Sequence, residues 1–145
     1  MKQKACFCIG LVFFFLCSLL WAQNGSYMVI VNSSNPILSM SKMDVTRLFL
    51  KKVTAWTNGD KVLPVDREET STLRMGFSTG ILGRSIEKVK AYWAQQLFSG
   101  LGTPPVTLRS DQEVLEFVDG NPNAIGYVSN GADLRHLNVK VLLIK

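Results

Sequence analysis

The sequence predicts an α/β fold in which a mixed, mostly parallel sheet is flanked by helices. Two patterns alternate along the chain. Short apolar runs rich in β-branched residues read as buried strands, and segments with apolar residues three and four positions apart read as helices. Gly, Pro and Asn cluster at the junctions between them. Strands that alternate with helices favour parallel pairing, because each helix carries the chain back across the sheet.

The elements can be placed from these patterns. The expected strands cover residues 27–31, 61–65, 106–108, 124–128 and 139–144. The expected helices begin near Ser41, Ser71, Ser85 and Ser110, and the last has the capping box Ser110-Asp111-Gln112-Glu113. Pro64 indicates a sheet edge or a strand end, and Gly80 is expected to end the second helix. On the third helix, Ile86, Val89, Trp93 and Leu97 form one apolar face, which Tyr92 and Phe98 widen.

The first 22 residues have the pattern of a secretory signal peptide. Lys2 and Lys4 precede an apolar run at residues 5–20, and Trp21-Ala22 resembles a cleavage region. The run is short for a membrane span, which needs about 20 apolar residues. An uncleaved N-terminal anchor is the alternative. We therefore expect a signal peptide at 1–22 and one domain at 23–145, a length sufficient for a single core.

Without that segment, the composition of the mature chain excludes several classes of function. All three cysteines, Cys6, Cys8 and Cys17, lie in it, so the mature chain would have no disulfide, thiolate nucleophile or Cys-ligated metal. Of 16 basic residues, loss of Lys2 and Lys4 leaves 14 against 11 acidic ones, a net charge of +3. No basic stripe with interleaved aromatics is present, so a nucleic-acid partner is not expected.

Catalysis and metal binding find little support. His136 is the only histidine, and it lies in a predicted loop with no candidate nucleophile near it in sequence. Zinc or iron would need more His or Cys ligands than the mature chain has. The adjacent pair Glu68-Glu69 points to different faces of any regular element, which makes it a poor acid–base pair. We expect no enzyme, no catalytic residue, no metal and no cofactor.

An oxyanion site is the best chemical candidate. Ligands of open α/β sheets lie beyond the carboxyl ends of strands, and two predicted turns fit that place. One carries Ser33 and Ser34, and the other runs from Arg67 to Thr72 at the start of a helix. There Arg67 would supply charge, while Thr70, Ser71, Thr72 and helix N–H groups would donate hydrogen bonds. The alternative is that Asp66 and Glu69 form a capping box with no ligand.

Five sequence blocks in order resemble the substrate-binding proteins of phosphate ABC transporters, a periplasmic-binding-protein-like family. The blocks are residues 39–51 followed by Trp56, residues 63–67, residues 91–93 with 98–100, residues 110–115, and residues 121–128. The Arg47-Leu48-Phe49-Leu50 and Ile125-Gly126-Tyr127-Val128 segments are the most specific. The resemblance implies a single lobe of this family, in the periplasm, that binds phosphate or a related oxyanion without catalysis.

The resemblance also assigns roles and shows departures. Arg67, Glu69 and Ser71 can stand for the family's Arg, acidic residue and Ser, and the acidic side chain would accept a hydrogen bond from protonated phosphate. Thr72-Leu73 replaces the family's Gly-Thr, and the chain is about half as long as a two-lobed member. A homodimer or a membrane transporter is a possible partner. The alternative function is a ligand-free periplasmic protein–protein interaction module on the same lobe.

Overall fold

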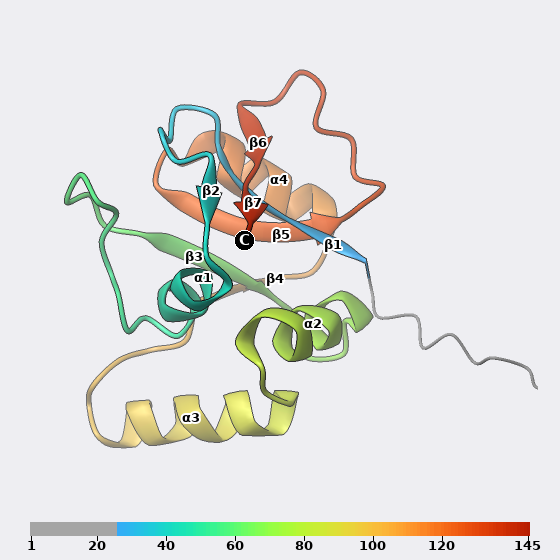
Figure 1. Ribbon diagram of the computed structural model, residues 1–145. Coiled ribbons are helices and arrows are strands. Elements are labelled where there is room, and N and C mark those ends of the chain that lie inside the picture. The colour runs from blue at the N-terminus through green and yellow to red at the C-terminus, as the bar shows by residue number, and fades with distance from the viewer. Residues whose placement is uncertain (1–25) are drawn as a thin grey trace, which may run out of the picture.

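A computed structural model describes residues 26–145, and the predicted signal peptide lies outside the described residues. The strands are β1 (Tyr27–Asn32), β2 (Ser39–Met40), β3 (Leu63–Arg67), β4 (Val106–Leu108), β5 (Ala124–Ser129), β6 (Val139–Val141) and β7 (Leu143–Ile144). The helices are α1 (Lys42–Phe49), α2 (Thr72–Phe77), the π-helical η1 (Ser78–Leu82), α3 (Ile86–Phe98) and α4 (Asp111–Gly120). Their order follows the predicted α/β alternation with two differences (Figure 1). β2 was not predicted, and the strand predicted at 139–144 is divided into β6 of the main sheet and β7, which pairs with β2 in a separate two-stranded sheet.

The main sheet has five strands in the order β4-β3-β5-β1-β6. β3 pairs in parallel with β4 and with β5, whereas β1 is antiparallel to both β5 and β6. Four strands therefore run one way and β1 runs the other, which confirms the mixed, mostly parallel sheet. Because β1 is reversed, its last residues lie at the edge where β3 and β5 begin.

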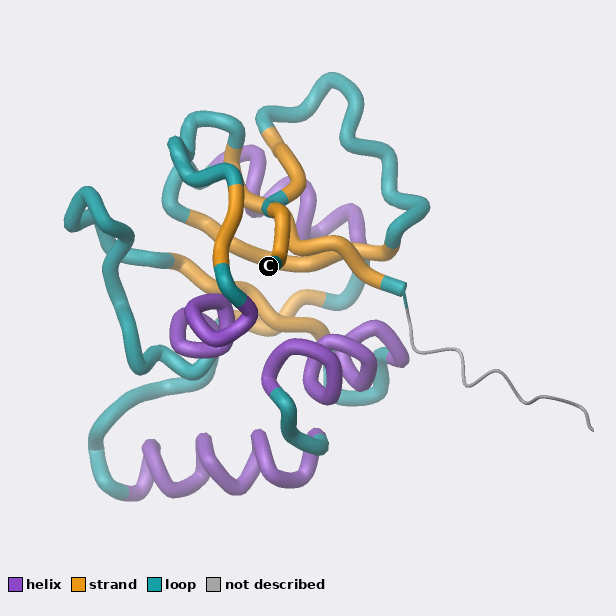
Figure 2. The backbone as a smooth tube through the Cα atoms, viewed as in Figure 1, coloured by secondary structure: helices purple, strands orange, loops and turns teal. Residues whose placement is uncertain are grey.

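Helices cover both faces of the sheet, with α1 and α2 on one face and α4 on the other (Figures 1 and 2). The first face holds an aromatic cluster in which the Phe77 and Tyr127 rings stack at 3.9 Å and Phe49 packs beside them. On the second face, Val114 and Val118 of α4 pack on the sheet. Gly126 of β5 permits that packing, because an added Cβ would lie 2.7 Å from Val65 and 2.8 Å from Val114.

The second predicted helix continues past Gly80. α2 passes into η1, and the helical turns end only at Gly83, whose φ of 62° is left-handed. Gly80 has a packing role instead, since a Cβ there would lie 2.4 Å from the Tyr27 hydroxyl oxygen. The prediction that Gly80 ends the helix was wrong.

Pro64 suggested a sheet edge or a strand end. β3 lies between β4 and β5, so the edge was wrong, but Pro64 is the second residue of β3, which confirms the strand end. Pairing with β4 begins only at Val65, and Pro64 therefore lies where β3 has a neighbour on one side. β3 also begins two residues later than predicted and extends to Arg67. Asp66 and Arg67 consequently belong to the buried strand.

α3 only partly follows its apolar pattern. Ile86, Val89 and Trp93 are buried as expected, but Leu97 and Phe98 are exposed. Periodicity predicts which side chains share a helix face, and it does not predict how far the rest of the protein extends along that face.

Candidate functional site

The carboxyl end of β3 delivers Arg67 into an ion pair. Its Nη1 lies 2.5 Å from Oδ1 of Asp111, the first residue of α4, and Nη2 donates to the backbone oxygen of Arg109 at 3.1 Å. The Arg67 side chain is only 10% exposed. Its Nε is buried and has no hydrogen-bond partner among residues 26–145. Arg67 is therefore held by the protein itself, with one donor unused.

Asp111 is fixed by β5 as well as by Arg67. The Ser129 backbone N–H donates to its carboxylate at 3.3 Å, and the Ser129 hydroxyl donates to Oδ2. Burial alone would raise the pKa of Asp111, but hydrogen bonds from Ser129 and Arg67 together hold it below its ordinary value. The carboxylate therefore stays ionised and keeps the Arg67 guanidinium oriented.

A second buried network lies beside the first. Asp66 accepts a 2.5 Å hydrogen bond from the Tyr127 hydroxyl and a 2.8 Å hydrogen bond from the Arg67 backbone N–H. Arg74 of α2 approaches the other Asp66 oxygen at 3.3 Å and donates to the Arg67 carbonyl at 3.0 Å. Burial and the Asp66 carboxylate raise the pKa of Tyr127, so its hydroxyl remains a donor. The network ties β3, β5 and α2 together.

This network overturns the capping-box interpretation of Asp66 and Glu69. Asp66 points into the core instead of capping α2, and the cap is Ser71, whose hydroxyl accepts from the Arg74 N–H at 3.4 Å. Glu69 is exposed and pairs with Lys90 at 2.7 Å. The start of α2 near Ser71 was predicted correctly, but the residue that caps the helix is Ser71 and not Asp66.

The remaining candidates at this edge lie near the surface. Thr70 and Thr72 are exposed, and Ser71 is half-buried. The opening is a shallow depression of about 470 Å³, lined by Glu68, Glu69, Thr70, Arg74 and Thr107. Arg67 does not line it. The structure thus brings Arg67, Glu69, Thr70, Ser71 and Thr72 to one edge, with the main cation beneath the surface.

Ser33 and Ser34 lie at the opposite edge of the sheet. They lie in the turn that follows β1, which runs antiparallel to β5, and the register of the two strands places Val31 beside Ile125, near the start of β5. Both serines are exposed there. They therefore do not join the Arg67 group, and the reversal of β1 is the reason that the two predicted turns do not meet.

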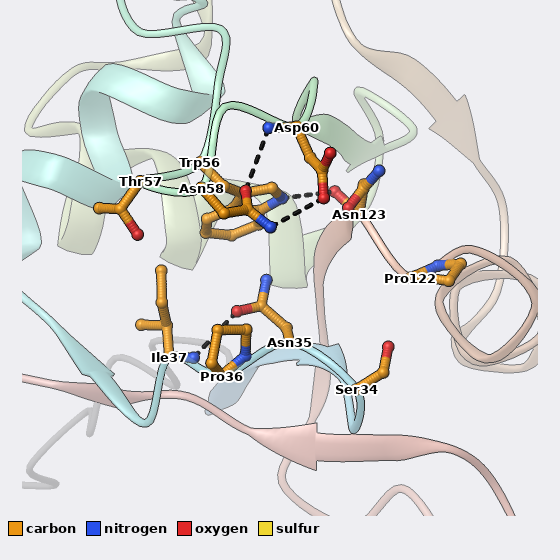
Figure 3. A pocket seen from close by; sticks show the side chains of 10 residues that line it. All are labelled: Ser34, Asn35, Pro36, Ile37, Trp56, Thr57, Asn58, Asp60, Pro122 and Asn123. Atoms are coloured by element: carbon orange, nitrogen blue, oxygen red, sulfur yellow. Dashed lines mark hydrogen bonds between the residues drawn. The ribbon is translucent and has the colours of Figure 1, made fainter.

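Ser34 instead lines a pocket of about 160 Å³ with both polar and apolar walls, shown in Figure 3. Trp56, Asn58, Asp60 and Asn123 face the turn that contains Ser34 and Asn35. Trp56 is buried, and its Nε1 donates to the Asn123 carbonyl at 3.0 Å. The pocket is distinct from the carboxyl edge of β3.

The sequence interpretation did not identify Asp111, Tyr127, Ser129 or Arg74 as partners of the β3 end. Asp111 was assigned to the predicted capping box of α4, of which half is present. Ser110 accepts from the Glu113 N–H at 3.1 Å, but the Glu113 carboxylate accepts from the Arg109 N–H at 2.7 Å and not from that of Ser110. Tyr127 carried a usable signal, since a hydroxyl within a buried strand needs a hydrogen-bond partner. Nothing local predicted that Asp66 would be that partner.

No group of three or more His, Cys, Asp or Glu residues within 26–145 is arranged to hold a metal ion. His136 is exposed in its loop, with a left-handed φ of 64°. Within the same part of the chain, no helix is long and apolar enough to cross a membrane.

Solved structures of phosphate-transport proteins resemble this one. The ABC-type phosphate transport receptor from Vibrio cholerae aligns with a TM-score of 0.63 at 20% identity, over 82% of this chain and 46% of that one. A putative phosphate ABC transporter substrate-binding protein with bound phosphate from Clostridium perfringens gives 0.64 at 22%, over 82% and 44%. PstS from Borrelia burgdorferi gives 0.66 at 13%, over 83% and 47%.

This chain spans less than half the length of these structures. No protein-family model matches the sequence, and no curated protein does. The structural likeness agrees with the resemblance in the five sequence blocks. The chain therefore has the fold of one periplasmic-binding-protein-like lobe, as found in phosphate ABC transporter substrate-binding proteins.

Proposed function

We propose that the protein is a periplasmic, non-catalytic solute-binding lobe that takes phosphate or a related oxyanion at the carboxyl end of β3. The observation that carries the proposal is Arg67, a buried cation with an unused Nε donor, placed four residues before the Ser71 cap of α2. Strand ends of open α/β sheets are the usual place for ligands. Proteins with the same fold include one solved with bound phosphate.

The hydrogen-bond donors at this edge suit an oxyanion. Ser71 begins α2, whose first N–H groups have no acceptor within the helix. Thr70 and Thr72 add exposed hydroxyls beside it. Glu69 can accept a hydrogen bond from protonated phosphate, which sulfate does not offer, so phosphate is the preferred member of the class.

The ion pairs at this edge make the proposed affinity weak. An anion must displace Asp111 from Arg67, or share the guanidinium with it, and must approach past the exposed Glu68 and Glu69. An open site also leaves water in competition for the same donors. We therefore expect a millimolar-range affinity for the isolated lobe and a stronger one if a second copy closes over the ligand.

The predicted signal peptide at 1–22 and the structural likeness support the periplasm as the location and delivery to an ABC transporter as the role. In that role, the lobe would release its ligand to a membrane partner. A homodimer would restore the two-lobed arrangement that the longer proteins have in one chain.

Calorimetric titration with phosphate and with sulfate tests the proposal. Arg67→Gln should weaken phosphate binding at least about tenfold, the effect of losing one charge-assisted hydrogen bond. Asp111→Asn should strengthen it severalfold, because the guanidinium is released from its carboxylate. Arg135→Gln is the matched control, since Arg135 forms an exposed ion pair with Asp133 in a loop.

Absence of heat in the wild type at millimolar phosphate would contradict the proposal, as would equal affinity in Arg67→Gln. Circular dichroism spectra should establish that each variant is folded. If binding is absent and folding is intact, the second candidate function remains.

That second candidate is a ligand-free protein–protein interaction module. The observation favouring it is that the buried Arg67 and the half-buried Arg74 are both paired with carboxylates of the same chain. Such pairs act as structural ties between elements without any ligand. This function predicts a partner protein whose capture is unchanged by phosphate and by Arg67→Gln.

A further inference from the structure

Exposed apolar side chains occur at the end of α3 and in the segment that leads from it into β4. At the end of α3, Phe98 is 96% exposed and Leu97 is 53% exposed. Leu101 follows at 74%, and Val106 of β4 is 54% exposed. Large apolar side chains that gather in one region mark contact sites more often than scattered ones do.

Leu101 and Val106, but neither Leu97 nor Phe98, line a groove of about 380 Å³. The end of α1, the start of β3 and the loop between α3 and β4 form its walls. The apolar side chains that line it include Leu48, Val53, Leu63, Leu101, Pro104 and Phe117. The groove can therefore receive apolar side chains from outside.

Two lysines make the groove positively charged. Lys51 and Lys61 both line it, and neither has a carboxylate within 4.0 Å in the described part of the chain. Lys51 donates to the Pro104 carbonyl at 3.3 Å, which holds its ammonium at the groove. Burial and the nearby Lys61 lower the pKa of Lys51, as expected for two like charges without a counter-ion. An acidic group is the missing complement.

The neighbouring backbone indicates the form of the occupant. β4 is the edge strand of the five-stranded sheet and pairs only with β3. An edge strand presents unpaired N–H and C=O groups on its outer side, which another extended chain can satisfy. An acyl chain with a carboxylate could fill the groove and meet the lysines, but it could not pair with β4.

We propose that this surface binds an extended, acidic segment of a partner protein. The segment pairs with the outer edge of β4, inserts apolar side chains into the groove and places carboxylates against Lys51 and Lys61. The surface lies at the amino end of β3, whereas the oxyanion edge lies at its carboxyl end. A test of one proposal therefore does not decide the other.

The probe is a dye-labelled synthetic peptide that alternates Glu and Val, followed by fluorescence anisotropy on the purified full chain. Saturable binding is expected by about 1 mM, an affinity ordinary for a short peptide on an edge strand. Replacing Glu by Lys in the peptide should abolish binding. Replacing the central Val by Pro should weaken it at least fivefold, because Pro has no N–H to donate.

The protein variants test the lysines directly. The double variant Lys51→Met with Lys61→Met should weaken binding about tenfold, and salt raised from about 0.05 to about 0.5 M should weaken it in the wild type but little in the double variant. Lys52→Met is the matched control, since Lys52 is exposed beside Lys51 and does not line the groove. It should bind like the wild type.

Several outcomes would overturn the inference. These are no saturable binding in the wild type, equal binding of the Lys–Val peptide, or an equal loss in Lys52→Met. Tolerance of the central Pro would point to an occupant that does not pair with β4. Dimerisation of the protein that Phe98→Ser abolishes, seen by sedimentation, would assign the surface to a second copy.

Discussion

Positively charged side chains are paired at the carboxyl end of β3 and unpaired at its amino end. At the carboxyl end of β3, Arg67 pairs with Asp111 and Arg74 pairs with Asp66, all within the protein. At the amino end, Lys51 and Lys61 face a groove without a carboxylate partner among residues 26–145. In the proposed function, a ligand would displace one of the paired charges. In the further proposal, the unpaired lysines would meet an acidic partner.

The sharpest contrast between the edges should appear in stability. Asp66→Ala leaves the Arg74 guanidinium and the Tyr127 hydroxyl without their buried partner, and should cost about 3–5 kcal/mol in the free energy of unfolding. Asp60→Ala, near the amino end of β3, removes an exposed carboxylate that contacts Asn58. This change should alter the free energy of unfolding by less than about 1 kcal/mol. Denaturant unfolding measures the loss of stability in both variants. Equal losses would contradict the difference described between the two ends of β3.

A smaller loss should follow from Tyr127→Phe. This change removes the hydroxyl that donates to Asp66 and leaves the aromatic stack on Phe77 in place. The expected cost is about 1–3 kcal/mol, the range for leaving a buried acceptor short of a donor. Tyr92→Phe is the control, since the half-buried Tyr92 hydroxyl donates only to the Leu50 carbonyl. A smaller loss in Tyr127→Phe than in Tyr92→Phe would show that the network adds little.

The pH dependence sharpens the role of Asp111. Its folded-state pKa is depressed, so the stability it contributes is present above the unfolded-state pKa and is lost as pH falls through the folded one. The difference in unfolding free energy between wild type and Asp111→Asn should be constant above about pH 5 and should shrink below about pH 4. A difference that persists unchanged into stronger acid would mean that Asp111 is not held by Arg67 and Ser129 as described.

The smallest effect is expected where charge is exposed at the carboxyl edge. Lys90 and Glu69 form an ion pair whose side chains are both more than half exposed. Lys90→Met should change the free energy of unfolding by less than about 0.5 kcal/mol, because water screens such pairs. A loss as large as that of Tyr127→Phe would show that surface charge, and not the buried network, organises this edge.

Much of the fold could be predicted from local patterns. The strands and helices follow apolar periodicity, and Ser41, Ser85 and Ser110 cap their helices as expected. The direction of β1 could not be predicted, because a continuous apolar run looks the same in a parallel and an antiparallel strand. That single ambiguity joined Ser33 and Ser34 to the Arg67 group, which lies at the other edge.

The candidate site was harder to predict, because its contacts are not local. Arg67 and Asp111 are 44 residues apart, and Asp66 and Tyr127 are 61 residues apart. Sequence alone identified Arg67 as a cation at a strand end, but it gave no sign that a carboxylate from α4 would occupy it. The exposure of Leu97 and Phe98 was missed for a related reason. The apolar pattern of a helix does not show how much of its apolar face other elements cover.

The central claim is that Arg67 exchanges an internal carboxylate for phosphate. The most direct measurement is ¹⁵N NMR of the Arg67 Nε–H during a phosphate titration, assigned by its loss in Arg67→Lys. We predict that the unpaired Nε–H resonance shifts progressively and saturates with phosphate, and that Asp111→Asn reaches saturation at a lower concentration. A resonance that stays fixed while phosphate binds, or while phosphate fails to bind at all, would contradict the claim.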